Sequence, residues 1–110
     1  MEDCIFCQIV AKKIPARIFW QNDEFLVFYE IKPRAPLHLL VIPKKHLVLD
    51  EVGEGEANLL ANLILTAKKV AEKAGLSQGY RLVINNGRQA GQEVDHLHLH
   101  LLGGGKLAAF

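Results

Sequence analysis

Residues 95–105 read DHLHLHLLGGG and place three of the chain's five histidines at every second position, separated by single leucines. Side chains of a β-strand alternate between its two faces. The pattern therefore predicts a strand over residues 96–102 that ends at the three glycines. His96, His98 and His100 would line one face, with neighbours roughly 6.5–7 Å apart. The leucines between them would cover the core.

The row of three histidines has three alternative interpretations. A half-exposed amphipathic strand would need polar residues, but it would not need three copies of a scarce one. A metal site is a second reading, because imidazole binds zinc, copper and iron. The third is phosphate chemistry, in which one imidazole attacks phosphorus and a neighbour transfers a proton. The preceding stretch NNGRQAGQEV (85–94) favours the third, because its glycines and backbone N–H groups suit a loop that cradles phosphate oxygens.

Composition narrows the class of protein. A chain of 110 residues predicts a single domain over 1–110, and half of its residues are hydrophobic, which argues against disorder. The net charge of +1 gives no basic footprint for nucleic acid. No apolar run reaches membrane-spanning length, and the start MEDCIFCQIV lacks the basic region of a signal peptide. We therefore expect a cytoplasmic protein whose two cysteines are thiols or metal ligands.

The remaining stretches predict an α+β fold. Asp3 is the expected cap of a short helix over 4–11. The stretches RIFW (17–20) and EFLVFYEI (24–31), separated by the turn signal QND, predict a hairpin. A proline-containing loop over 31–36 leads to an apolar strand from residue 37, which Pro43 should end.

One long helix is predicted over residues 54–74, with Gly75 as its C-terminal stop. Its apolar stripe is Leu60, Ile64, Ala67, Val70 and Ala71. A further strand, YRLVIN (80–85), follows the helix. Five strands, mostly in hairpin order, with one long and one short helix predict an antiparallel sheet with a helix packed on it.

Several motifs in the same order resemble one family. HLHLHLL matches the His-φ-His-φ-His-φ-φ signature of the histidine triad (HIT) family of nucleotide hydrolases and transferases, where φ is an apolar residue. The resemblance covers nearly the whole chain, through residues 14–46 and then GYRLVINNG (79–87) and GQEVDHLHLHLLGGG (91–105). The short length of the chain and the HLLGG motif resemble the nucleoside phosphoramidase branch more than the dinucleoside polyphosphate hydrolases.

The resemblance implies a reaction and a site. His98 would attack the α-phosphorus of an adenosine 5′-phosphoramidate or acyl-adenylate, and water would then release AMP. His100 would contact the phosphate and leaving group, and His38 would lie near the scissile bond. The other implied nucleotide contacts are Asn85, Gly91, Gln92, Glu93 and Val94 at the phosphate, Glu30 and Ile31 at the ribose, and Ile5, Phe6, Ile14 and Phe28 at the base.

Each implied residue also has a plainer reading. His38 could be a satisfied polar group in a buried strand, Asn85 a turn residue and Glu30 a solvated charge, while Phe6 and Phe28 could belong to the core. Glu93 stands where some relatives have a serine that faces the leaving group. The sequence also ends ten residues past His100, whereas longer relatives carry a segment that reaches the partner subunit's site. The substrate selectivity of those relatives is therefore not carried over to this chain.

Cys4 and Cys7 have the CxxC spacing of a zinc knuckle, a redox pair or two ordinary thiols. Some HIT relatives bind zinc through this motif, the histidine of PKKH and the first histidine of the triad. The implied ligands here are Cys4, Cys7, His46 and His96. Four protein ligands would make the zinc structural.

We expect an enzyme that acts on purine nucleotides and forms a two-fold homodimer through the long helix and the strand after it. Dinucleoside polyphosphate hydrolysis is one alternative. The others are a nucleotide-binding regulatory module with little turnover and a zinc-dependent hydrolase that uses all three histidines.

Overall fold

The computed structural model of the chain describes residues 3–110 and contains one five-stranded antiparallel sheet in the order β1-β2-β3-β5-β4. The strands are β1 (Ile18–Gln21), β2 (Phe25–Tyr29), β3 (Leu37–Pro43), β4 (Tyr80–Val83) and β5 (Leu99–Gly103). The helices are α1 (Ile5–Val10) and α2 (Ala57–Lys73), with short 3-10 turns η1 (Leu49–Glu51), η2 (Glu54–Glu56) and η3 (Arg88–Ala90). The predicted α+β fold is confirmed.

The hairpin of β1 and β2 forms at the predicted turn. The side-chain oxygen of Asn22 accepts hydrogen bonds from the N–H groups of Glu24 and Phe25, at 3.0 and 2.7 Å. Such a bond lets asparagine stand in for a backbone turn. β2 ends at Tyr29, so the predicted strand over 24–31 was too long at both ends and Glu30 belongs to the following loop.

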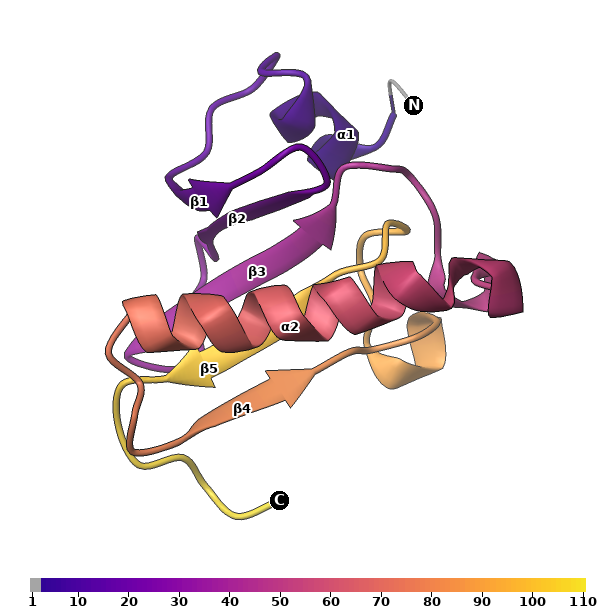
Figure 1. Cartoon of the computed structure of the whole chain (residues 1–110). Helices are drawn as coiled ribbons and strands as arrows, with labels where there is room; N and C mark the ends of the chain where they lie inside the picture. Colours follow the sequence, from indigo (N-terminus) through magenta and orange to yellow (C-terminus); the bar gives the residue numbers. More distant parts are fainter. Residues whose placement is uncertain (1–2) are drawn as a thin grey trace.

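The long helix α2 lies across one face of the sheet, over β3 and β5 (Figure 1). Its buried stripe is Leu63, Thr66, Ala67, Val70 and Ala71. The prediction of Ile64 in this stripe was wrong, because the contact line runs through Leu63 and leaves Ile64 42% exposed. Residues 54–56 form the turn η2 instead of helix. The stop at Gly75 is confirmed by its left-handed φ of 77°.

The two faces of the sheet carry different residues. The face under α2 holds the larger core, to which β5 contributes Leu99 and Leu101. The opposite face packs against α1 through a second cluster formed by Cys4, Phe6, Leu26, Phe28, Leu40 and Ile42. The even-numbered residues of β3 and β5 therefore point away from α2, and the histidines share their face.

The start of β5 differs from the prediction. The ladder with β3 begins at Leu99, so the expected strand over 96–102 starts three residues too early. Leu97 donates its N–H to Leu47 in the loop after β3 instead of to a strand. The alternation still holds there, since Leu97 lies in the core under α2 and His98 lies on the other face. Gly103, the first of the three glycines, belongs to β5.

The short helix α1 begins at a different cap from the one predicted. The N-cap is Cys4, not Asp3, because the sulfur of Cys4 accepts the N–H of Cys7 at 3.4 Å. This contact brings the two cysteines together at one end of α1. Within residues 3–110 no helix is both long and apolar enough to cross a membrane.

Candidate functional site

A cleft of about 790 Å³ opens on the face of the sheet opposite α2. All of the predicted nucleotide-binding and catalytic residues except Gln92 line it. They arrive from α1, β2, β3, β5 and the loops that follow Val10, Tyr29 and Val83. The fold therefore brings residues that are almost 100 positions apart in the sequence, from Ile5 to His100, around one space.

One end of the cleft is apolar. Ile5, Phe6, Ile14 and Phe28 form its walls. The rings of Phe6 and Phe28 meet edge-on with centroids 5.5 Å apart, and Phe6 also meets the ring of His98 at 5.2 Å. Both phenylalanines are part of the second core cluster as well, so the core reading and the base-pocket reading describe the same walls. Such a surface suits a planar heterocycle.

The hydrogen bonds of the histidine row fix where its protons lie. Nδ1 of His98 bonds the backbone carbonyl of His96 at 2.7 Å, so Nδ1 carries the proton and Nε2 keeps its lone pair. The backbone N–H of Arg34 donates to Nδ1 of His38 at 3.0 Å, which leaves the proton of His38 on Nε2. Nε2 of His38 then donates to Nδ1 of His100 at 2.9 Å. The proton of neutral His100 is therefore on Nε2.

Burial keeps His38 and His100 uncharged. Burial lowers the pKa of His100 to about 4, with smaller contributions from the charges of His98, His38 and Arg34. Burial also lowers the pKa of His38, against a raising effect of Glu30 and with a further lowering by Arg34. At neutral pH both imidazoles are therefore neutral, which the directional chain of hydrogen bonds requires.

The loop before β5 is built around Gln92. Its side-chain oxygen accepts the N–H of Gly87 at 2.8 Å, and its side-chain nitrogen donates to the carbonyl of Val94 at 3.0 Å. Gln92 is buried inside the loop and, unlike its neighbours Gly91 and Glu93, does not line the cleft. No hydrogen bond within residues 3–110 uses the N–H of Glu93 or Val94, and both residues line the cleft.

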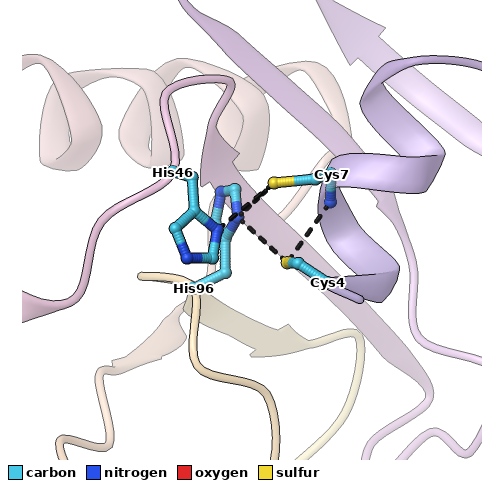
Figure 2. A group of neighbouring side chains, drawn as sticks. All are labelled: Cys4, Cys7, His46 and His96. Atoms are coloured by element: carbon cyan, nitrogen blue, oxygen red, sulfur yellow. Dashed lines mark hydrogen bonds between the residues drawn. The ribbon is translucent and has the colours of Figure 1, made fainter. Parts of the chain in front are cut away.

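A second cluster lies beside the cleft, where Cys4, Cys7, His46 and His96 converge (Figure 2). Their four ligand atoms all lie within 4.8 Å of one another. Nδ1 of His96 is 3.5 and 3.6 Å from the two sulfurs, and Nδ1 of His46 is 3.2 Å from the sulfur of Cys7. These are the four residues implied by the resemblance.

The cluster fits a tetrahedral metal ion. With metal–sulfur bonds of about 2.3 Å and metal–nitrogen bonds of about 2.0–2.1 Å, sulfur and nitrogen ligands lie about 3.6 Å apart. Nε2 of His96 donates to the carbonyl of Pro43 at 2.7 Å, which leaves Nδ1 as the electron-pair donor. Burial, followed by the neighbouring Cys4, raises the pKa of the Cys7 thiol. A bound cation would reverse that shift, because metal binding favours the thiolate.

The cysteine–histidine cluster and the cleft share α1. Phe6 lies between Cys4 and Cys7 in the sequence, and its ring contacts both His96 and His98. The division of the triad follows from this geometry. His96 points into the cluster, whereas His98 and His100 line the cleft.

Comparison with known proteins decides the family. The sequence model of the HIT domain matches residues 11–107. The chain belongs to the HIT family. A HIT-like protein of Synechococcus elongatus, itself uncharacterized, is 49% identical over 109 residues, which cover 97% of this chain and 95% of that protein.

Solved HIT structures have the same fold. A HIT family hydrolase from Legionella pneumophila superposes with a TM-score of 0.93 at 46% identity and covers 96% of each chain. A histidine triad protein from Clostridium difficile gives 0.95 at 38% identity and covers 100% of this chain and 97% of that one. The described residues of this HIT protein therefore have the fold of these relatives over nearly their whole length.

Sequence reasoning missed several cleft residues of this HIT protein. Leu102 lines the cleft two positions after His100, and the period of two along β5 could have placed it there. Arg34 also lines the cleft, but only because its loop folds back onto His38. No local pattern in the sequence signals that fold.

Proposed function

We propose that this HIT protein hydrolyses adenosine 5′-phosphoramidates or acyl-adenylates to AMP through a nucleotidylated His98. The observation that carries the proposal is the lone pair on Nε2 of His98, in a cleft where the next imidazole, His100, presents a hydrogen on Nε2. A nucleophile beside an N–H group that can donate a hydrogen bond to the phosphate or the leaving group is the arrangement that group transfer at phosphorus needs. The Legionella relative is described as a hydrolase, which agrees.

The reaction would run in two displacements. In the first, Nε2 of His98 bonds to the α-phosphorus as the bond to the leaving nitrogen breaks, and that nitrogen, protonated by solvent, departs as the amine while Nε2–H of His100 donates a hydrogen bond to the reacting group. In the second, water attacks phosphorus, the bond to His98 breaks so that His98 is again neutral, and the proton of the water passes to solvent. The carbonyl of His96 stabilises the positive charge on His98 through Nδ1–H.

The rest of the cleft would bind the nucleotide. The N–H groups of Glu93 and Val94, with the amide of Asn85, would meet phosphate oxygens, because all three residues line the cleft and the two N–H groups have no hydrogen bond within residues 3–110. Glu30 and Ile31 would hold the ribose, and the apolar end would take the purine. Gln92 would support the loop instead of touching the ligand.

Two alternatives have less support. A regulatory module with little turnover would have no need for a free Nε2 on His98 or for a proton directed by His100. A hydrolase that uses all three histidines on a metal is disfavoured, because the described cluster includes only His96 of the three. Dinucleoside polyphosphate hydrolysis uses the same displacement with a different leaving group, and a substrate panel separates the two.

The proposal includes structural zinc at Cys4, Cys7, His46 and His96, because two thiolates and two imidazoles with tetrahedral spacing form the donor set that zinc prefers. All four ligands come from the protein, so no position is left for substrate. Zinc would tie α1 to the loop after β3 and to the segment before β5. We also propose a two-fold homodimer and a cytoplasmic location.

The test is incubation with adenosine 5′-phosphoramidate, followed by mass spectrometry for AMP and for a nucleotidylated peptide that contains His98. A His98→Ala variant that still binds AMP is the control. AMP release with no adduct on His98, or a variant with activity within about tenfold of the parent, would contradict the assignment of the nucleophile.

A further inference from the structure

The charges around the cleft are unevenly distributed. Three cationic side chains, Arg17, Lys32 and Arg34, line it together with two carboxylates, Glu30 and Glu93. None of the three cations forms an ion pair with another residue in the described part of the chain. The guanidinium of Arg17 is stacked on the ring of Tyr29 at 4.0 Å. Lys32 and Arg34 are exposed and have no such contact, so their charges are available to a ligand.

The backbone holds Arg34 at the histidine row. Its N–H donates to Nδ1 of His38 at 3.0 Å, so the residue cannot move away from the row without breaking that bond. Burial is the main cause of the lowered pKa of His38 and His100, and the charge of Arg34 adds a smaller lowering to each, behind the opposing charge of Glu30 at His38. Arg34 therefore belongs to the environment of the reacting atoms, although its side chain is exposed.

The order of groups along the cleft indicates which part of a substrate meets Arg34. Phe6, at the apolar end, touches His98, whose ring centroid is 5.0 Å from that of His100. His100 is followed by His38 at 5.1 Å, and His38 by Arg34. In the proposed reaction the base would occupy the apolar end and phosphorus would lie against His98. The leaving group, beyond His100, would then face Arg34.

We propose that Arg34, assisted by Lys32, determines specificity for leaving groups that carry an anionic substituent, a carboxylate or a phosphate. The inference rests on the proposed hydrolysis and names its substrate class. An anion on the leaving group would interact with an unpaired guanidinium, which binds carboxylate and phosphate in the same bidentate manner. A cationic leaving group would be repelled by the same charge.

The experiment compares adenosine 5′-phosphoramidates of amines of matched length. Propylamine gives a neutral leaving group, β-alanine a carboxylate, 2-aminoethyl phosphate a phosphate and 1,3-diaminopropane a cation. Values of kcat/KM are measured at pH 8, where His38 and His100 stay neutral with or without the arginine because burial lowers the pKa of each. The readout is the ratio of anionic to neutral substrate, which cancels general effects on the reaction.

We expect a ratio of about 3–10 for the parent, since an exposed charge contact contributes about 0.2–1 kcal/mol and two cations act together. Arg34→Gln should lower the ratio toward 1, and Lys32→Gln should lower it less. Raising the salt from about 0.02 M to about 0.5 M should also lower it, because the screening length becomes much shorter. Comparing the carboxylate and phosphate arms shows which anion is preferred.

Lys68→Gln is the matched control. Lys68 is an exposed cation on α2, on the other side of the sheet, and this variant should keep the parent's ratio. A parent ratio below about 2, or a ratio that Arg34→Gln leaves unchanged, overturns the inference. In that case, AMP formation from the phosphoramidate of propylamine still upholds the proposed hydrolysis. If no substrate of the panel is hydrolysed, both proposals fail.

Discussion

Replacement of His100 by glutamine should remove part of the acid sensitivity of the fold. The pKa of His100 is about 4 in the folded chain, whereas an unhindered imidazole has 6.5. Between these values the unfolded chain binds a proton that the folded chain does not, so stability falls as pH drops from 6.5 to 4. Below pH 4 both states are protonated and this loss stops. Glutamine cannot titrate, and its oxygen can still accept the hydrogen bond from Nε2 of His38.

The size of the effect follows from the gap in pKa. At pH 5 the pH is about 1.5 units below the pKa of this histidine in the unfolded chain. At about 1.36 kcal/mol per unit, the stability lost between pH 7 and pH 5 is at most about 2 kcal/mol. His100 is partly open to the cleft, and solvent screening reduces this to about 1 kcal/mol. The parent should therefore lose about 1 kcal/mol more than His100→Gln over this interval.

The assay is urea unfolding at pH 7, 6 and 5 for the parent, for His100→Gln and for the surface variant Lys68→Gln. Carboxylates and metal ligands also titrate in this range, but they are common to all three proteins and cancel in the differences. The surface variant should follow the parent at every pH. Equal losses in the parent and in His100→Gln would refute the assignment of a depressed pKa at this residue.

Other predictions address the reaction, the metal, the core and the assembly. His98→Ala should lower kcat on the order of a thousandfold or more and leave AMP binding measurable by calorimetry. Metal analysis should find about one zinc per chain, and Cys4→Ser with Cys7→Ser should lower the melting temperature, as a chelator does; a metal-free sample of equal heat stability would leave ordinary thiols. Gly103→Ala should cost about 1–3 kcal/mol, because a methyl group there would lie 2.9 Å from a buried leucine, whereas Gly53→Ala, with open space around it, should cost far less. Light scattering at micromolar concentration should give a dimer, and a monomeric mass would contradict the two-fold assembly.

The period of two in the histidine row predicted which side chains face the core, and that prediction survives where the strand ladder itself does not. Leu97 and His98 take opposite faces although neither is in β5. The ladder starts late because the N–H of Leu97 goes to Leu47, a partner on a distant loop. A hydrogen bond to a distant loop has no local signal in the sequence. Only the sheet face of each side chain could therefore be predicted, and not the residue at which the strand begins.

The apolar stripe of α2 shows a related limit. Its sequence has leucines and an isoleucine on more than one side, and several stripes fit the helical period equally well. The sheet selects the line through Leu63 and Val70 and leaves Ile64 outside. The CxxC spacing likewise predicted half of a metal site from local sequence. Its completion by His46 and His96 depends on the fold, and here it was anticipated only through the family resemblance.

The small size of α1 has a consequence for the order in which the chain folds. A helix of six residues is too short to be stable alone in water. Its anchors are distant, since Cys4 meets His96 across 92 positions of sequence. Its apolar partners Phe28 and Leu40 lie much nearer in the sequence. Packing of α1 on the sheet and closure of the cysteine–histidine cluster are therefore separable events, because the second needs residue 96 to be in place.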